Sequence, residues 1–242
     1  MHTVKCSQRD FECVEFVLSY SNNEDKKLLD NLILSSKELA TKVNPYLARD
    51  ASRIRDFNTV WINAFAGLVS EWCWRYWLKQ QVKKKSLNLK IEPGKFSTAT
   101  NQIDIVVHYP NCITKYIEVR SSFPYTGLEN AICRAFNIIG WYVNPIKHME
   151  IRKDYYVMAL FPFKSSKIWE RLKNGQFACY LVGGATRKLL EENEYAEDKE
   201  LTPYYEICYG VYAKKTIYRV IPIVKAYDII EITERILNGA DV

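Results

Sequence analysis

The sequence predicts one α/β domain in which helices flank a central mixed β-sheet. Its 242 residues are enough for a single sizeable domain, and 48% hydrophobic with 26% charged residues is an ordinary globular composition. Apolar residues recur at helical spacing over residues 22–44 and 55–83, and two short β-type runs follow at 102–108 and 114–121. A chain that mixes both patterns in this way is typical of the α/β class.

The second helical stretch contains the first candidate site residue. Steps of four and three along it follow a mostly apolar stripe, which Glu71 and Arg75 interrupt. Because Glu71 shares this stripe, we expect it to point inward, although an exposed i,i+4 pair with Arg75 is the simpler interpretation. Lys83, Lys84 and Lys85 end the stretch, where cations suit the helix dipole. The apolar members of the stripe are Phe57, Trp61, Ala64, Leu68 and Leu78.

The remaining elements are predicted from shorter patterns. A third helix is expected over 128–143, where apolar residues again recur at helical spacing. Gly183 and Gly184 are interpreted as a turn before a helix that ends near residue 192, and the acidic segment 191–200 is expected to be an exposed loop. The other predicted elements are a strand at 155–163, a short helix at 165–173, a strand at 177–182, a hairpin of strands at 205–212 and 216–224, and a helix at 228–237.

Charge and cysteine content indicate what kind of partner and which cellular compartment to expect. The formal charge of +6 and the isoelectric point of about 8.8 are compatible with a polyanionic partner such as nucleic acid. The seven cysteines include no CxxC pair, and their number is odd. These features argue against a zinc ribbon or a disulfide framework and favour a reducing, cytoplasmic setting. We expect no secretory signal and no membrane span, since the chain has no h-region and no apolar run near the required ~20 residues.

Charged residues inside the two β-type runs are the most informative feature of the chain. Asp104 lies in the first run, and Glu118 and Arg120 lie two residues apart in the second. Side chains alternate faces along a strand, so a hairpin symmetric about residue 111 would place Asp104 opposite Glu118 and Gln102 opposite Arg120. The two carboxylates would then have Cβ atoms about 5 Å apart. Such a pair is costly to bury unless a cation compensates it, and a divalent metal ion is the obvious candidate.

This pattern resembles the signature of the PD-(D/E)XK nuclease superfamily, which includes type II restriction endonucleases, resolvases and repair nucleases. Asp104 matches the Asp of that signature, and Glu118-Val119-Arg120 matches its (D/E)-x-K. Glu71, in the preceding helix, lies where many members carry a Glu near the metal, and the segment GLENAICRAF fits the helix after the motif.

The resemblance implies a restriction-endonuclease-like core over about residues 55–163 of a single domain, 1–242. Residues 164–242 would then be an elaboration for dimerisation, DNA recognition or both. The expected activity is Mg²⁺-dependent hydrolysis of phosphodiester bonds in double-stranded DNA by a homodimer, with Mn²⁺ as a substitute ion.

The resemblance also implies a role for each site residue. Asp104 and Glu118 would hold one or two metal ions, and Glu71 would contribute directly or through water. Arg120 would position the attacking water or clamp the scissile phosphate, and Gln102 would orient a ligand from the same face. Arg120 departs from the family pattern because it stands where the family has Lys, and an Arg cannot give up its proton near neutral pH. No Pro precedes Asp104, a second departure.

Other residues are candidates for DNA contacts, and other functions stay open. Asn130 and Arg134 would share the polar face of the third helix, and such side chains contact phosphates, although ordinary surface is the commoner interpretation. Lys83, Lys84 and Lys85 are candidates on the same basis. One alternative is a catalytically weak or inactive nucleic-acid-binding module on the same fold, and another is a junction resolvase or repair nuclease. An unrelated α/β protein with an accidental motif is a third.

Overall fold

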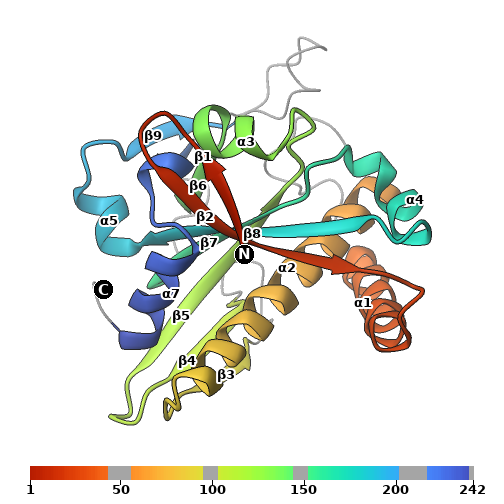
Figure 1. Cartoon of the computed structure of the whole chain (residues 1–242), viewed down its shortest axis with the longest axis horizontal. Coiled ribbons are helices and arrows are strands. Elements are labelled where there is room, and N and C mark those ends of the chain that lie inside the picture. The colour runs from red at the N-terminus through yellow and green to blue at the C-terminus, as the bar shows by residue number, and fades with distance from the viewer. Residues whose placement is uncertain (43–55, 95–102, 144–151, 202–216, 240–242) are drawn as a thin grey trace.

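The computed structural model describes residues 1–42, 56–94, 103–143, 152–201 and 217–239, and its centre is a seven-stranded mixed sheet (Figure 1). Strands β5 and β7 run parallel, and every other neighbouring pair in this sheet is antiparallel. The strand order is β1 (His2–Lys5), β2 (Asp10–Leu18), β8 (Phe177–Thr186), β7 (Tyr155–Leu160), β5 (Thr114–Ser122), β4 (Ile105–His108) and β3 (Lys90–Pro93). The predicted α/β class with a mixed central sheet is therefore confirmed.

Helices and a smaller sheet cover the central sheet. The smaller, antiparallel sheet has the order β6 (Asn137–Tyr142), β10 (Ile217–Pro222) and β9 (Glu197–Glu200). The helices are α1 (Asn23–Lys42), α2 (Phe57–Lys84), α3 (Leu128–Asn130), α4 (Ile168–Lys173), α5 (Arg187–Glu192) and α7 (Ile229–Asn238), with a π-helical turn at Ala131–Ala135 and 3₁₀ turns at Ser165–Lys167 and Ile223–Lys225. Within the described ranges, no helix combines the length and the apolar character needed to cross a membrane.

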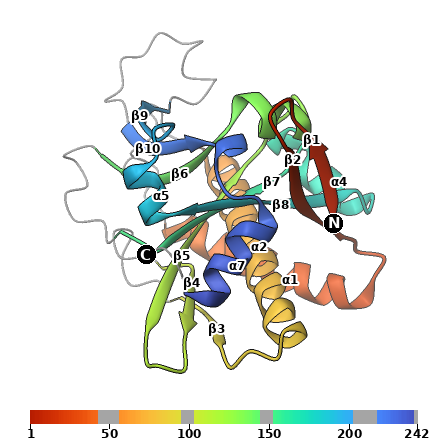
Figure 2. The ribbon, with the colours of Figure 1, turned by 60° about the vertical axis from the view of Figure 1, so that its left-hand side comes forward.

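The two faces of the central sheet bury different side chains. On one face, Ile117 and Val119 of β5 join α1, α2 and α7 in the larger hydrophobic core. On the other face, the alternate residues of β7, such as Tyr156 and Met158, pack with β6, α5 and the π-helical turn. Figures 1 and 2 show α1 and α2 on one side of the central sheet and the three-stranded sheet on the other. Because side chains alternate along a strand, Glu118 lies on the face opposite α2.

Helix α2 is the longest helix, and its buried face differs from the predicted stripe. Asp56 caps it, since its Oδ1 accepts a hydrogen bond from the Thr59 N–H at 2.8 Å. Of the predicted stripe only Leu78 is buried and Phe57 is 46% exposed, so the predicted phase is wrong for most of the helix. The helix is apolar on most sides because it packs on both α1 and the sheet, so spacing alone did not identify its inward face. The buried residues are Val60, Ile62, Phe65, Ala66, Val69, Ser70, Cys73, Trp74 and Leu78.

The helix predicted over 128–143 is wrong beyond its first two turns. After α3 and the π-helical turn, the chain forms β6, which pairs with β10. The sequence of β6, NIIGWY, is rich in β-branched and aromatic residues, which fit a half-buried strand. Gly140 allows a close approach, since a Cβ there would lie 2.9 Å from the Arg219 carbonyl oxygen. Pairing with a strand some 80 residues later in the chain therefore outweighs the helical spacing.

Gly183 and Gly184 do not form the predicted turn. Both lie inside β8, where the pairing with β7 shifts register, and helix α5 begins only at Arg187. Gly183 has φ +106°, and a Cβ there would lie 2.2 Å from the Tyr227 carbonyl oxygen, so this position requires glycine. Part of the acidic loop predicted over 191–200 is strand β9 instead.

The hairpin β1–β2 was not predicted, whereas the predicted helices at both ends of the chain are confirmed as α1 and α7. The predicted strand 205–212 lies outside the described residues.

A disulfide joins Cys6, in the β1–β2 turn, to Cys133, in the π-helical turn, with Cα atoms 5.3 Å apart. The cysteine count had favoured reduced thiols throughout the chain, and this expectation is wrong for these two residues. Spacing in sequence could not indicate the pair, because the two residues are separated by 127 positions and meet only when the hairpin reaches the π-helical turn.

Candidate functional site

The β4–β5 hairpin has the register that the sequence predicted. Ile105 pairs with Ile117, and Val106 pairs with Tyr116. Asp104 lies at a bend immediately before β4, so continuing this register places it opposite Glu118. The two carboxylates on which the metal hypothesis depends are therefore neighbours on adjacent segments of the sheet. Gln102, the fourth member of the predicted group, lies outside the described residues.

Both carboxylates are buried. Asp104 is 7% exposed and Glu118 is 8% exposed. Asp104 Oδ2 accepts a hydrogen bond of 2.7 Å from the backbone N–H of Val119. Strand β4 begins at residue 105 and offers no backbone carbonyl to the Val119 N–H, so the Asp104 carboxylate accepts this hydrogen bond instead. This bond holds Asp104 against the strand that carries Glu118.

Burial and neighbouring acids together disfavour the ionised form of Asp104. Burial, and after it the negative charge of Glu118, raise the pKa of Asp104 from 3.8 to about 7. The charge of Glu71 acts in the same direction, whereas the Val119 hydrogen bond and the Arg120 charge oppose the shift. A divalent ion beside Asp104 and Glu118 would remove the repulsion between them.

Arg120 lies next to Glu118 and against an aromatic pair. Its Nη2 is 2.9 Å from Glu118 Oε1. Its guanidinium carbon lies 5.8 Å from the ring centroid of Tyr142, a residue of β6. The Tyr142 ring in turn packs on Tyr218 of β10, with centroids 4.4 Å apart. The three-stranded sheet therefore forms one wall beside the carboxylates, and sequence patterns did not indicate this because the strand β6 was not predicted.

Glu71 is not a third member of a metal-binding group. Its Oε1 accepts a 2.8 Å ion-pair contact from Arg75, as the simpler interpretation of the sequence predicted, and burial raises its pKa. It belongs to α2, on the face of the sheet opposite Glu118. Among the described residues, no three His, Cys, Asp or Glu side chains are grouped closely enough to hold a metal ion. The expected convergence of three acids is thus not supported, and the site has two carboxylates with Glu71 as a more distant charge.

The lysines that end α2 lie well away from Glu71, the candidate residue of the same helix. Lys83 follows Glu71 by twelve residues, or about 18 Å along the helix axis. Lys83 and Lys84 are exposed, and Lys85 forms an ion pair with Glu234 of α7. The structure does not bring these three predicted DNA contacts to the candidate site.

Asn130 and Arg134 border a surface hollow of about 450 Å³ together with Lys5 from β1. Asn130 Nδ2 donates a hydrogen bond of 2.9 Å to Thr126 Oγ1, and the Arg134 side chain is exposed. The sequence could not connect Lys5 to these residues, because it belongs to the unpredicted hairpin.

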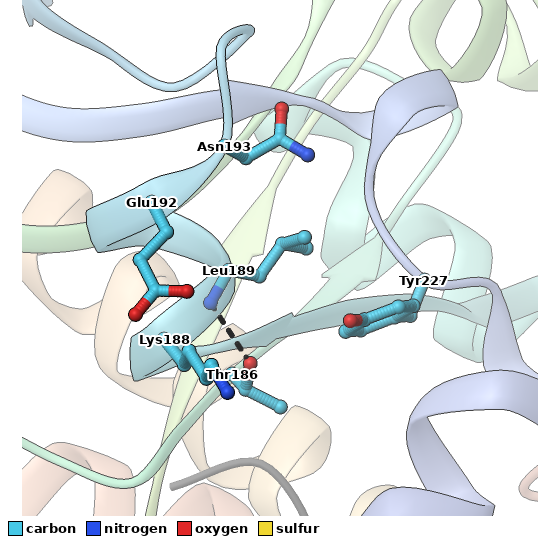
Figure 3. A pocket seen from close by; sticks show the side chains of 6 residues that line it. All are labelled: Thr186, Lys188, Leu189, Glu192, Asn193 and Tyr227. Atoms are coloured by element: carbon cyan, nitrogen blue, oxygen red, sulfur yellow. Dashed lines mark hydrogen bonds between the residues drawn. The ribbon is translucent and has the colours of Figure 1, made fainter.

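A second hollow, of about 260 Å³, lies where β8 ends and α5 begins (Figure 3). Thr186 caps α5 there, since its Oγ1 accepts a hydrogen bond from the Leu189 N–H at 3.0 Å. Figure 3 shows Lys188 and Glu192 on the α5 side and the Tyr227 ring on the other. The residues that line this hollow do not form a recognisable catalytic arrangement, and no sequence motif includes them.

Comparisons with known proteins do not assign a function to the chain. No protein-family model matches the chain, and no curated protein matches it significantly. The carboxylate pair, Arg120 and their surroundings are therefore the basis for assigning a function.

Replacing Tyr142 tests whether the three-stranded sheet holds Arg120 in place. Tyr142→Leu removes the ring contacts with both Arg120 and Tyr218, so we expect the free energy of unfolding to fall by about 1–2 kcal/mol. Tyr142→Phe keeps the ring and should cost less than half of that. Urea denaturation of Tyr142→Leu, of Arg120→Leu and of the variant that carries both changes gives a double-mutant cycle with an expected Arg120–Tyr142 coupling of about 0.5–1 kcal/mol. A coupling of zero would show that the ring does not hold the guanidinium.

Proposed function

We propose that this protein is a metal-dependent nuclease that hydrolyses phosphodiester bonds in double-stranded DNA. One observation carries the proposal: Asp104 and Glu118 are buried side by side on adjacent segments of the sheet, with Arg120 beside them. Two neighbouring buried carboxylates lower the stability of a folded protein. Acidic groups with perturbed pKa values are common at functional sites, so this pair is a candidate site. Mg²⁺ suits such a site, because it is commonly held by one or two carboxylates together with water and substrate phosphate.

The order of elements supports a restriction-endonuclease-like core as part of the proposal. Helix α2 precedes the antiparallel strands β3, β4 and β5, and α3, the π-helical turn and β6 come between β5 and β7, which is parallel to β5. This order supports the match of Asp104 and Glu118-Val119-Arg120 to the superfamily signature. Strand β8 and helix α7 come from the part predicted to be an elaboration, yet they complete the central sheet and its helical layer.

The proposed mechanism assigns a separate task to each side chain. A bound Mg²⁺ would supply a water of lowered pKa and neutralise charge on the reacting phosphate. Asp104 and Glu118 would hold the ion, and the Val119 N–H keeps the Asp104 carboxylate oriented toward Glu118. Arg120 cannot act as a general base, because its guanidinium stays protonated. Its donors instead suit the non-bridging oxygens of the scissile phosphate, which would compete with Glu118 for them.

Incubating the purified protein with linear and supercoiled duplex DNA tests the proposal directly. Reactions with Mg²⁺, with Mn²⁺ and with EDTA should differ, and cleavage is expected only with a divalent ion. Discrete fragments would indicate sequence-specific cutting, and sedimentation in the presence of DNA would show whether the active form is the expected homodimer. Intact DNA under all metal conditions, at high protein concentration, would contradict the nuclease proposal.

A second candidate function is a nucleic-acid-binding module that has lost catalysis. It is favoured by the ion pair between Arg120 and Glu118, which already neutralises one of the two carboxylates, and by Arg in place of Lys. Such a module would bind duplex DNA with a strong salt dependence and would not cleave it.

Arg120→Lys separates the two functions. A lysine at this position can transfer protons, and general acid–base catalysis commonly contributes about 10²-fold or more. If the site is catalytic, we expect the Lys variant to cleave about tenfold to hundredfold faster than the wild type and with a steeper pH dependence, whereas Arg120→Leu should be slower than both. Absence of cleavage by the Lys variant, with DNA binding retained, would favour the binding module.

A further inference from the structure

The hollow beside the disulfide brings together residues from two distant parts of the chain. It lies between the β1–β2 turn, which includes Cys6 and Ser7, and the segment from Thr126 to Arg134. Its lining has two cations, from Lys5 and Arg134, and one acid, Glu129. The other lining residues are Ser7, Thr126, Gly127, Leu128, Asn130 and the two cysteines. The lining is therefore mainly polar, with a small excess of positive charge.

The Cys6–Cys133 disulfide links the two sides of this hollow. Lys5 immediately precedes Cys6, and Arg134 immediately follows Cys133, so the covalent bond brings the two cations to one rim. The β1–β2 hairpin is also anchored elsewhere, because Arg9 Nη2 lies 2.9 Å from Asp228 and 2.8 Å from Glu231. The fold around the hollow therefore does not depend on the disulfide alone, and the disulfide adds a covalent constraint on the spacing of the rim.

The chemistry of the rim fits a phosphate diester better than an apolar ligand. Lys and Arg bind phosphate oxygens through charge-assisted hydrogen bonds, and Ser, Thr and Asn are common phosphate contacts as well. Pockets for small apolar ligands are lined mainly by hydrophobic and aromatic side chains, and this one is not. Strand β5 leads from the carboxylates to the hollow: Glu118 and Ser122 are about 13 Å apart along the strand, and Thr126 follows four residues later. The carboxylates and the hollow are thus joined by one strand and a four-residue connection.

We propose that this hollow binds a backbone phosphate of DNA away from the scissile bond, and that the Cys6–Cys133 disulfide sets the spacing of its two cations. The inference rests on the proposed function, since it takes the same duplex as its ligand. Reduction of the disulfide lets the β1–β2 turn and the π-helical turn move apart. DNA affinity thus depends on the redox state of this protein, although no residue of the carboxylate site contains sulfur.

Equilibrium binding in EDTA tests the inference without any cleavage. Fluorescence anisotropy with a labelled duplex, at several salt concentrations, gives the dissociation constant and the salt slope of the full chain. Lys5→Gln combined with Arg134→Gln should weaken binding about tenfold and lower the magnitude of the salt slope by about one, since one phosphate contact is lost. Dithiothreitol, or Cys133→Ser, should weaken binding by a smaller factor, about threefold. Lys79→Gln, at an exposed position of α2, is the matched charge control, and Cys112→Ser, at an exposed free cysteine, is the thiol control.

Each result supports or overturns part of the inference. Unchanged affinity and slope in the Lys5/Arg134 variant would overturn the phosphate site, and equal affinity with and without dithiothreitol would overturn the role of the disulfide. Circular dichroism of every variant shows that a loss of binding is not a loss of fold. Tight binding of inorganic phosphate that duplex DNA does not displace would indicate a free phosphate compound and overturn DNA as the ligand. A failure of the nuclease proposal is recognised separately, as salt-dependent binding without cleavage when Mg²⁺ is restored.

Discussion

Asp104→Asn is expected to abolish metal-dependent DNA cleavage and, at the same time, to stabilise the metal-free protein. The asparagine side chain has nearly the same shape, and its oxygen can still accept the hydrogen bond from the Val119 N–H. It lacks the charge that holds a metal ion, so we expect cleavage to fall by at least about 10³-fold. It also removes the repulsion between two buried carboxylates, which opposes folding when no cation is bound.

The stabilisation should depend on pH in a defined direction. The pKa of Asp104 is about 7 in the folded protein and 3.8 ordinarily, so between these values the folded protein holds a proton that the unfolded chain has lost. The contribution of Asp104 to stability is therefore fully present below about pH 4 and is lost as the pH rises to 7. We expect Asp104→Asn to exceed the wild type in free energy of unfolding by roughly 1–4 kcal/mol at pH 8, with little difference near pH 4.

Urea denaturation in EDTA at pH 4, 6 and 8 measures this difference, and a parallel series with Mg²⁺ tests the ion directly. Metal binding to the folded state should raise the melting temperature of the wild type and leave that of Asp104→Asn unchanged. Asp10→Asn is a suitable control, since Asp10 is an exposed residue of β2. Cleavage retained by Asp104→Asn would remove the catalytic assignment, and a loss of stability at pH 8 would show that the carboxylates are compensated in the metal-free protein.

Reduction of the Cys6–Cys133 disulfide is expected to lower the free energy of unfolding by about 2–5 kcal/mol. The bond closes a loop of 127 residues, and a cross-link over such a span removes much conformational freedom from the unfolded chain. For a domain of this size, each kcal/mol corresponds to about 2–4 °C in melting temperature. The folded state should persist after reduction, because Val4 and Ile132 on either side of the bond belong to the same buried cluster.

Thermal and urea unfolding with and without dithiothreitol measure this effect. Cys133→Ser should unfold like the reduced wild type and should no longer respond to dithiothreitol, whereas Cys112→Ser should respond as the wild type does. Alkylation of the denatured protein before and after reduction should reveal two additional thiols. Coincident unfolding curves under both conditions, or no additional thiols, would show that Cys6 and Cys133 are not bonded.

Local signals in the sequence were sufficient for several elements and for the central part of the site. The C-terminal helix has a capping box, in which Asp228 accepts from the Glu231 N–H and Glu231 accepts from the Asp228 N–H, so its start is encoded within four residues. The β4–β5 register was predictable because a short connection between two strands leaves few ways to align them. The juxtaposition of Asp104 and Glu118 follows from that register, and so it could be predicted before the structure.

Contacts between distant parts of the chain determined the rest. Strand β6 forms because β10, far along the chain, offers it a partner, and the same segment read alone has helical spacing. Glu71 was expected at the metal because it shares the mostly apolar stripe of its helix and lies where the superfamily carries a Glu, and only the packed sheet shows that Glu118 projects from the opposite face. The disulfide and the hollow beside it join segments that no periodicity connects. The spacing of residues along a chain reflects only local conformational preference. Burial and strand pairing depend on which surfaces meet when the whole chain has folded.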